Sequence, residues 1–584
     1  MKFNKHNFIY LQVAETITQL IKDLYPSESI DFDSLYSQLS RPPKSDMGDI
    51  AFGCFIISKA LKKSPADVSK ELQNALKQSE LILEAKSFGP YLNFYLNPKE
   101  INKIILTKIL SNEFFENKLI NNAPKTIIEF SQPNTHKEMH VGHMRNLCLG
   151  DALIKLHRYA GVETIATTFP GDVGTHVAKC LWYYKKHCKE SPPKERKGAW
   201  LGTLYTKGNN LLEEQRGSEF EVSNREELTA ILKQLHAGSG EYFELWKETR
   251  QWSLDLMNSV YDWANVKFDS WYWESDVDAS SVSLVKKYYD KGLFIEDEGA
   301  IGIDLKEYKL GFCLLLKSDG TGLYATKDLE LARRKFDEQG VERSIYVVDN
   351  RQALHFKQVF KTLELMGFPH AKDCYHLEYE MVELTDGAMS SRKGNIVPLQ
   401  DLIDQMILKI KTDYLNRYKD EWSEDKINHT ANIVAAGAIK YGMTKIDSHK
   451  KIVFDMSEWL KLDGESGPYI QYVHARINSL LQKTNLDISA DFSLLDHTLE
   501  KELILKLNQF NDTVESALKN YKIHLICTYL YELSKSFNSF YAECSVLNAN
   551  DENLKNARVK LCQAVKITIS KGLGLIGIEA PDSM

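Results

Sequence analysis

The stretch TIIEFSQPNTHKEMHVGHMRNLCLGDALIKLHRYAGVETIATTF, residues 126–169, decides the fold class. It opens on a strand-like run at 126–130, and apolar residues then recur at three- and four-residue spacing from about 141 to 160, as in a helix. Gly161 predicts the end of that helix, and a second strand-like run follows at 163–169. Strand, helix and strand within about 45 residues form a βαβ unit. We therefore expect an α/β domain with a parallel, doubly wound sheet.

The same pattern returns later in the chain. Residues 344–349 and 375–384 have strand-like composition, and residues 353–367 between them have helical periodicity. The residues at about 186–320 separate the two halves; they are helical in the middle and strand-rich near the end. The sequence thus predicts one sheet-based domain at 121–425 that carries an insertion at about 186–320.

Two further domains flank this one, because 584 residues exceed what a single hydrophobic core usually organises. Residues 1–120 alternate helical patterns with short strands such as 91–97, which predicts an α+β domain. From about 426 onward, long helical stretches such as 521–543 dominate, with almost no strand signal. We expect an all-α domain at 426–584.

The composition excludes several classes of protein. The longest apolar run, at 431–439, is too short to cross a bilayer, and the N-terminus lacks the continuous apolar core of a signal peptide. Nine scattered cysteines include no C-x-x-C pair, which favours a reducing compartment and disfavours a structural zinc site. A net charge of −7 gives no global sign of nucleic-acid binding, although a local basic face would suffice. We expect a cytoplasmic protein without a membrane segment.

Three histidines, His136, His140 and His143, lie within eight residues and raise the question of a metal site. The zinc motif H-E-x-x-H needs two histidines four residues apart with an internal Glu, and this stretch lacks that arrangement. Gly142 between His140 and His143 suits close approach of a ligand to the backbone, and a helix start offers free N–H groups to phosphate. H-x-G-H alone disfavours a metal site but leaves both a plain capped helix and a nucleotide site open, and we expect a structural or peripheral role for His136.

A second polar loop, DGAMSSRKGN at 386–395, follows a predicted strand of the same sheet. Its serines can donate hydrogen bonds, and Arg392 and Lys393 supply positive charge for phosphate. Alone it would be an ordinary exposed turn. Paired with H-x-G-H in the other half of the sheet, it becomes specific for a nucleotide site.

Together the two elements, HVGH at 140–143 and MSSRKG at 389–394, resemble the paired signatures of the class I aminoacyl-tRNA synthetases. Longer blocks resemble the arginyl-tRNA synthetases in particular, and they span nearly the whole chain. These blocks are RPPKSDMGDIAFGCFIISKAL (41–61), FSQPNTHKEMHVGHMRNLCLGD (130–151), YATKDLELARR (324–334), YVVDNRQALHFKQVF (346–360), SGPYIQYVHARINSLL (466–481) and GLGLIGIEAP (572–581). The resemblance implies a Rossmann-like catalytic domain between an additional N-terminal tRNA-binding domain and a helical anticodon-binding domain.

The resemblance also implies the reaction. Arginine and ATP would form arginyl-adenylate, and arginine would then pass to the 3′ end of tRNA(Arg); Mg²⁺ would assist, no zinc would be needed, and a monomer is favoured. A carboxylate attacks the α-phosphorus in this chemistry, so positioning and cations matter more than a covalent nucleophile. The ATP-binding and catalytic residues implied are Lys137, His140, Gly142, His143, Met389, Ser390, Ser391, Arg392 and Lys393.

Arginine recognition requires carboxylates, since a planar guanidinium pairs with them bidentately. In the family, a Tyr and an Asp four residues later on one helix face do this, and Tyr324 and Asp328 match them here. The whole arginine-binding set implied is Gln132, Asn134, His143, Glu274, Tyr324, Asp328 and Gln352.

The chain departs from the family patterns at a few positions. Ala388 stands for the first Lys of the K-M-S-K-S signature, and Ser391 and Arg392 replace its last two residues. Arginyl enzymes compensate with a Lys just before H-x-G-H, a position that Lys137 occupies. Gln132 stands where the family has Ser, which leaves its role open.

The helical domain supplies a further set of candidates by the same resemblance. Exposed aromatic and polar groups there would stack on and hydrogen-bond to unpaired bases, the usual mode for single-stranded RNA. These candidates are Tyr469, Gln471, Tyr472, His474 and Arg476.

Three other functions stay open at this point. Another class I synthetase such as the cysteinyl type lacks support, because zinc-type cysteines are missing and Tyr324 and Asp328 are present. A small-molecule nucleotidyltransferase also uses H-x-G-H but needs no helical domain of this size. A non-catalytic tRNA-binding paralogue is disfavoured by intact His140, His143 and Lys393, although Ala388 leaves it open.

Overall fold

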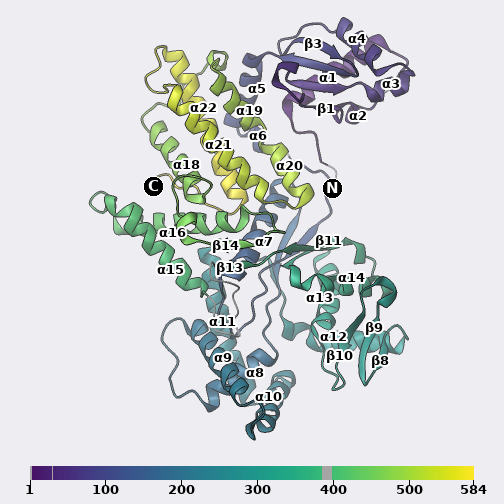
Figure 1. Ribbon diagram of the computed structural model, residues 1–584, viewed down its shortest axis with the longest axis vertical. Coiled ribbons are helices and arrows are strands. Elements are labelled where there is room, and N and C mark those ends of the chain that lie inside the picture. The colour runs from purple at the N-terminus through teal and green to yellow at the C-terminus, as the bar shows by residue number, and fades with distance from the viewer. Residues whose placement is uncertain (1–2, 29, 117, 385–396) are drawn as a thin grey trace.

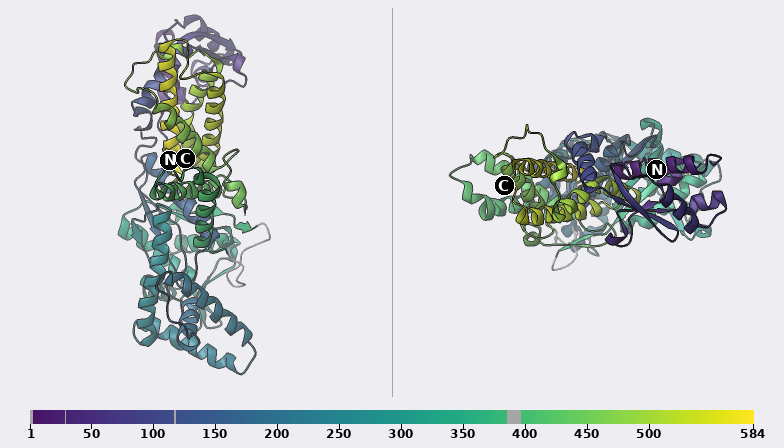
Figure 2. Two further views of the ribbon diagram at one scale, coloured as in Figure 1. Left: turned by 90° about the vertical axis from the view of Figure 1, so that its left-hand side faces the viewer. Right: turned by 90° about the horizontal axis from the view of Figure 1, so that it is seen from above.

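The computed structural model describes residues 3–28, 30–116, 118–384 and 397–584. The molecule is elongated, with the N-terminal domain at one end of the long axis and the helical part of the insertion at the other (Figures 1 and 2). The central sheet and the C-terminal helices lie between these two ends.

The central sheet has five parallel strands. They are β5 (Thr126–Glu129), β6 (Thr164–Thr168), β7 (Ser270–Trp271), β11 (Arg343–Asp349) and β12 (Cys374–Tyr379), in the order β12-β11-β5-β6-β7. Among these five strands β5 comes first in the chain, yet it lies at the centre of the sheet. The sheet is therefore wound outward in both directions. This confirms the predicted parallel, doubly wound fold.

Helix α7 (Val141–Tyr159) crosses from β5 to β6 and is buried along most of its length. Gly150 lets it approach the sheet, because a Cβ there would lie 2.1 Å from the Phe130 ring. The opposite side of α7 packs against α16 (Glu424–Thr444) and α22 (Glu552–Leu575) of the C-terminal domain. One helix therefore joins the central sheet to the helical domain.

The predicted strand at 375–384 is wrong as a single element. It divides into β12 and β13 (Val382–Leu384), and β13 pairs in parallel with β14 (Ile452–Phe454) in a separate two-stranded sheet. Buried Arg145 of α7 donates to the Glu380 carbonyl between the two strands (2.7 Å) and so fixes the break. The loop that follows thus leaves from the small sheet rather than from the central one.

The predicted insertion at 186–320 is also two pieces rather than one. Its helical piece contains α8 (Thr175–Lys186), α9 (Lys197–Glu214), α10 (Phe220–Ala237) and α11 (Glu241–Trp263). The chain then returns to the central sheet as β7. After α12 (Glu274–Asp290), an antiparallel sheet forms from β8 (Ile295–Asp297), β9 (Ala300–Asp304) and β10 (Phe312–Leu316). Helices α13 (Tyr324–Gln339) and α14 (Ala353–Leu365) flank β11.

The N-terminal domain is α+β, as expected. Its antiparallel sheet has the order β1-β2-β4-β3, from Leu39–Ser40, Ile50–Gly53, Tyr91–Leu96 and Ile82–Phe88. Its helices are α1 (Phe8–Leu24), α2 (Phe32–Tyr36), α3 (Phe55–Leu61) and α4 (Pro65–Ala75). Helices α5 (Pro98–Leu110) and α6 (Glu113–Glu116) follow, and α5 packs on α22 of the helical domain.

The C-terminal domain is mainly helical, with the short strand β14 inserted after α16. After α15 (Leu399–Ile410) and α16 come α17 (Met456–Trp459), α18 (Gly467–Leu481), α19 (Thr498–Asn508), α20 (Phe510–Asn520) and α21 (His524–Glu543), with α22 last. Among the described residues, no helix has both the length and the apolar composition that crossing a membrane requires.

Candidate active site

The first turn of α7 is built by its own histidines. His140 is the N-cap residue, and its Nδ1 accepts from the Gly142 backbone N–H (3.1 Å). The Nδ1 of His143 accepts from the His140 backbone N–H (3.0 Å), so each ring caps the other's backbone. The ring centroids are 3.9 Å apart. Two imidazoles that accept from backbone must be neutral at those nitrogens, so both are held uncharged.

Electrostatics agree with these hydrogen bonds. Burial lowers the pKa of His140 to about 4, and the positive charges of Arg351 and Lys137 add to the effect. Burial, His140 and Lys137 likewise hold the pKa of His143 well below its usual range. Neutral rings at a helix start leave that end free to attract anions.

The chain beyond residue 396 returns against this helix start. Val397, Pro398 and Leu399 pair antiparallel with residues 139–141, through bonds such as Leu399 N–H to the Met139 carbonyl (2.9 Å). The described chain that follows the signature loop therefore runs directly beside H-x-G-H. The loop residues named from the sequence, Ala388, Met389, Ser390, Ser391, Arg392 and Lys393, lie outside the described residues.

A polar cleft of about 1410 Å³ opens beside this helix start. Residues of α8, α9 and α10 form one wall, and residues of α12, α13 and the segment 317–323 after β10 form the other. Asn134, Lys137, Tyr324 and Lys327 line it, and the Lys137 ammonium lies 4.8 Å from the Tyr205 ring centroid. Its further charged and amide lining groups are of both signs: Lys179, Asn209, Asn210, Glu213, Arg216, Lys233, His236, Asp278, Lys317 and Asp319.

Asn134 and Glu274 converge on Gly171, in the loop after β6. A Cβ at Gly171 would lie 2.3 Å from Asn134 Oδ1 and 3.4 Å from Glu274 Oε2, so the glycine is what allows the two side chains to approach. Burial raises the pKa of Glu274 to about 7; the Lys327 charge opposes this and the Asp172 and Asp328 charges reinforce it.

Lys327 is the neighbouring cation of this carboxyl group. Its Nζ lies 3.6 Å from Glu274 and 3.5 Å from Asp278, one turn later on α12, and only 9 % of the residue is exposed. One ammonium group thus serves two carboxylates. Lys327 was not predicted from the sequence, although this residue lies directly before Asp328 in the motif at 324–334.

Tyr324 and Asp328 lie one turn apart at the start of α13, as predicted from their spacing. Tyr324 is 69 % exposed and lines the cleft. Asp328 Oδ2 lies 2.5 Å from His355 Nε2 on α14. Burial alone would lower the pKa of His355, but the hydrogen bond and charge of Asp328 outweigh it and raise that pKa. His355 was not among the residues predicted from the sequence.

The two glutamines of the predicted arginine set differ in their surroundings. Gln132 donates to Glu129 Oε1 (3.1 Å) and accepts from Asn146 (3.2 Å), so its amide is already used in the interior. Gln352 is exposed and ends a short 3-10 turn just before α14, one turn ahead of His355.

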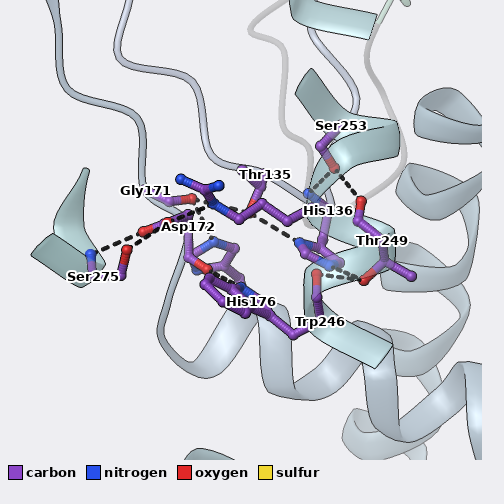
Figure 3. A network of polar contacts seen from close by, with 10 residues as sticks. Thr135, His136, Gly171, Asp172, His176, Trp246, Thr249, Ser253 and Ser275 are labelled. Carbon is purple, nitrogen blue, oxygen red and sulfur yellow. Dashed lines mark hydrogen bonds and ion pairs between the residues drawn. The ribbon is translucent and has the colours of Figure 1, made fainter. Parts of the chain in front are cut away.

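A buried polar network supports the loop that carries Gly171 (Figure 3). The Asp172 carboxylate accepts from Arg250 Nε (2.8 Å) and from Ser275 N (3.0 Å) and Oγ (2.7 Å). His136 bonds to the hydroxyls of Thr135 (2.9 Å) and Thr249 (2.8 Å). It is completely buried, and burial lowers its pKa to about 3. His136 is therefore structural, as expected, and the network ties the cleft to α11.

The residues predicted to face tRNA in the helical domain fall into two groups. Gln471 is fully buried and donates to the carbonyls of Ile433 (3.1 Å) and Glu579 (2.8 Å), and His474 donates to the Pro581 carbonyl (2.9 Å). These two side chains hold the C-terminal segment and belong to the interior rather than to a base-binding surface. Tyr469 and Tyr472 are half-buried, and Arg476 is exposed with its guanidinium 4.5 Å from the Tyr541 ring.

Comparisons with known proteins cover the whole chain. Residues 105–456 match the family model described as tRNA synthetases class I (R), catalytic domain. Residues 11–96 match the arginyl tRNA synthetase N terminal domain, and residues 470–584 match the DALR anticodon binding domain.

Relatives and solved structures agree with the family models. The chain is 53% identical to the arginine–tRNA ligase of Bdellovibrio bacteriovorus over 582 residues, 99% of this chain and 100% of that protein. It is 35% identical to that of Clostridium botulinum over 95% of this chain and 97% of that protein. The Thermus thermophilus arginyl-tRNA synthetase structure superimposes with a TM-score of 0.79 at 26% identity, covering 98% of this chain and 99% of that one. The chain therefore belongs to the arginyl-tRNA synthetase family of class I aminoacyl-tRNA synthetases.

Proposed function

We propose that this enzyme joins arginine to tRNA(Arg) by using two differently charged halves of one site. The observation that carries the proposal is the placement of the candidate groups after the carboxyl ends of adjacent parallel strands. Asn134 follows β5, Gly171 follows β6, Glu274 follows β7 and Gln352 follows β11. Open α/β sheets bind their ligands at this edge.

The start of α7 is the nucleotide half. Neutral His140 and His143 add no charge of their own, so the positive end of the helix dipole would act on the ATP phosphates, while the backbone N–H groups of His140 and Gly142 stay capped by the two rings. Gly142 keeps the surface flat enough for the nucleotide, and Lys137 supplies a cation from the adjacent turn. Met389, Ser390, Ser391, Arg392 and Lys393 complete this half in the proposal by family resemblance.

The facing ends of α12 and α13 are the arginine half. Asp328 would take the guanidinium group, Glu274 would be the second carboxylate, and Tyr324 would cover the side chain. Asn134 and His143 would hold the backbone end of arginine, and Gln352 would reach it from the strand edge. A lysine substrate would pair poorly with this fork-shaped arrangement, at a cost of about 3–5 kcal/mol for an uncompensated buried charge.

Gln132 is assigned a supporting role. Its amide connects Glu129 to Asn146 behind the arginine half, and Glu129 is itself paired with buried Lys335. This supports a role in holding the strand end in position, rather than direct contact with arginine.

The cleft and the helical domain would bind tRNA. Basic groups on the α8–α10 wall suit the phosphates of the acceptor end. In the helical domain exposed Arg476 is the best placed candidate for contact with bases, followed by half-buried Tyr469 and Tyr472. One chain carries the nucleotide half, the arginine half and the tRNA-binding surfaces, so a monomer in the cytoplasm would suffice.

Magnesium would assist as the companion of ATP. Among the described residues no group of three His, Cys, Asp or Glu side chains is arranged to hold a metal ion. In the proposal the magnesium ion is carried mainly by phosphate oxygens and water, since Mg²⁺ is usually bound by few protein groups. The ion would neutralise phosphate charge, and the protein residues would position the reactants.

Charging of total tRNA with each labelled amino acid tests the proposal. We expect arginine alone to be attached, and absence of arginine charging would overturn it. Pyrophosphate exchange should in addition require both arginine and cognate tRNA, because family members couple activation to tRNA binding; exchange without tRNA would contradict that part.

A further inference from the structure

The two carboxylates assigned to arginine recognition each already have a cation in the structure. Glu274 has the Lys327 ammonium at 3.6 Å, and Asp328 has the His355 imidazole at 2.5 Å. These two cations differ in kind, because a lysine stays charged at neutral pH whereas a histidine does not have to.

We propose that His355 positions the Asp328 carboxylate for the arginine guanidinium and that it releases its own proton when arginine binds. This inference rests on the proposed role of Asp328 and adds a residue and a proton to it.

The geometry supports the positioning role. Asp328 lies in the second turn of α13 and His355 in the first turn of α14, and the two helices pack together. Their side chains are only 14% and 21% exposed, so the contact is largely removed from water. His355 Nε2 bonds to Oδ2 alone, and the other carboxylate oxygen remains available for a substrate donor.

Competition for one carboxylate supports the proton release. When arginine binds, Asp328 faces two cations, and a guanidinium cannot be deprotonated in a protein. Two like charges at one carboxylate disfavour each other, so the group that can lose its charge does so. Neutral His355 can keep an N–H on Nε2, and the positioning hydrogen bond therefore survives the loss of charge.

The surroundings of His355 leave Asp328 as its dominant charged partner. The raised pKa of His355 is due to Asp328, which overcomes burial. The neighbouring titratable group on β12 is His376, whose Nε2 donates to the Val348 carbonyl (2.9 Å); burial lowers its pKa and His355 lowers it further. His376 is thus neutral where His355 titrates. Glu274, with a pKa of about 7, is the other group whose charge would respond to arginine.

The direction of the pH dependence follows. Without arginine the pKa of His355 is above its usual value, and with arginine it falls. Between these two values binding releases a proton, so arginine affinity rises with pH by at most about tenfold per pH unit for this group. Above the higher value the affinity is independent of His355.

Calorimetry of arginine binding to the full chain tests the proposal, in buffers of different ionisation enthalpy from about pH 6 to about pH 8. His355→Gln keeps an amide N–H near the position of Nε2 but cannot titrate. It should bind arginine nearly as the wild type does at the upper pH and lose the His355 share of proton release. His355→Ala should bind more weakly at every pH. Glu274→Gln should remove its own share of protons and retain that of His355.

Controls separate failure of this inference from failure of the proposed function. His376→Gln should keep the wild-type proton release. Two results would overturn the release step: His355→Gln releases as many protons as the wild type, and the Glu274→Gln, His355→Gln double variant releases as many as Glu274→Gln alone. Wild-type affinity of His355→Ala would overturn the positioning role. If Asp328→Asn binds arginine normally, the assignment of Asp328 itself fails. Unchanged tRNA affinity and thermal unfolding of each variant show that the fold is intact.

Discussion

The start of α7 and the facing ends of α13 and α14 both carry histidines next to a proposed substrate, but their surroundings give them opposite charge. His140 and His143 accept hydrogen bonds from backbone N–H groups and lie near Lys137 and Arg351, so their pKa values are depressed. His355 faces a carboxylate, and its pKa is raised. Histidine thus has two different roles. Beside the proposed ATP site it is neutral and accepts hydrogen bonds from backbone N–H groups, and beside the proposed arginine site it can titrate and competes with arginine for the Asp328 carboxylate.

This difference in histidine protonation explains how one sheet edge could hold ATP and arginine together. A charged histidine at the helix start would need to break its cap, since a protonated Nδ1 cannot accept. A neutral, non-donating group beside Asp328 would leave a mostly buried carboxylate poorly satisfied when arginine is absent. Each histidine therefore has the protonation state that its partner requires.

Removal of the Asp328 carboxylate should have the largest effect on this comparison. Asp328→Ala should weaken arginine binding by roughly two to three and a half orders of magnitude, because the guanidinium would be buried without its partner at about 3–5 kcal/mol. ATP and tRNA binding should change little, since the nucleotide half is built on α7. Equilibrium binding of each ligand measures this.

Asp337→Ala on the same helix is the matched control, because that carboxylate is exposed and pairs with Arg333. It should leave arginine binding unchanged. Equal losses of arginine and tRNA affinity in Asp328→Ala would place Asp328 outside the arginine half.

Removal of the Lys327 charge should have the next largest effect. In Lys327→Met the pKa of Glu274 should rise further above about 7, because the opposing positive charge is lost. At neutral pH Glu274 would then be protonated, and the arginine KM in tRNA charging should rise by about tenfold for a shift of one pH unit. The loss should recover at higher pH, where Glu274 ionises again.

Lys327→Arg keeps the charge and should keep most of the activity. A Lys327→Met enzyme whose arginine KM is raised equally at all pH values would show that Lys327 acts through packing and not through Glu274.

The sequence predicted some helices and strands of the catalytic domain more accurately than others. β5, α7, β6, α14 and the H-x-G-H turn rest on short-range periodicity and capping, so they were predicted with nearly correct bounds. β13 was assigned to the wrong sheet because its partner β14 lies about 70 residues later, beyond any local pattern.

The same reasoning explains the site residues that were missed or misplaced. Asp172 meets Arg250 from a separate helix of the insertion, and His355 meets Asp328 across two helices, so only tertiary packing brings them together. Gln471 and His474 are polar and helical, which resembles an exposed surface in the sequence. The C-terminal segment covers them, and nothing local to α18 reveals that.

A change of pH should separate the two kinds of histidine. The pKa of His140 is about 4 in the folded state against about 6.5 unfolded, so its contribution to stability is present above pH 6.5 and is lost as pH falls toward 4. The wild type should therefore lose about 1.4 kcal/mol of unfolding free energy per pH unit from this group in that window. His140→Asn keeps a cap that cannot titrate and should lose less by that amount.

His355 should behave in the opposite sense. Its folded pKa is raised, so its contribution is present below the unfolded value and is lost as pH rises through the folded one. Urea unfolding of the wild type, His140→Asn and His355→Gln across this range measures both. Identical pH dependence in the wild type and His140→Asn would mean that His140 is not held neutral by the fold.

The smallest expected effect concerns Gly142 and lies within about 1 kcal/mol in stability. A Cβ at this position would lie 3.0 Å from the Nδ1 and Cε1 atoms of the His140 ring, so Gly142→Ala must displace the ring that caps α7. Weakening the cap costs about 1 kcal/mol, but alanine is favoured over glycine in a helix by about the same amount. The two terms oppose, and the unfolding free energy should hardly move. The displaced ring and the added methyl group should nevertheless raise the ATP KM while the arginine KM stays near its wild-type value.

Gly340→Ala at the far end of α13, where φ is +58° and no atom lies within 4 Å of the added carbon, is the contrasting control. It should lower stability through backbone strain and leave both KM values alone. Glycine at position 142 would then be required for nucleotide approach, and a Gly142→Ala enzyme with unchanged ATP KM would restrict the histidine pair to helix capping.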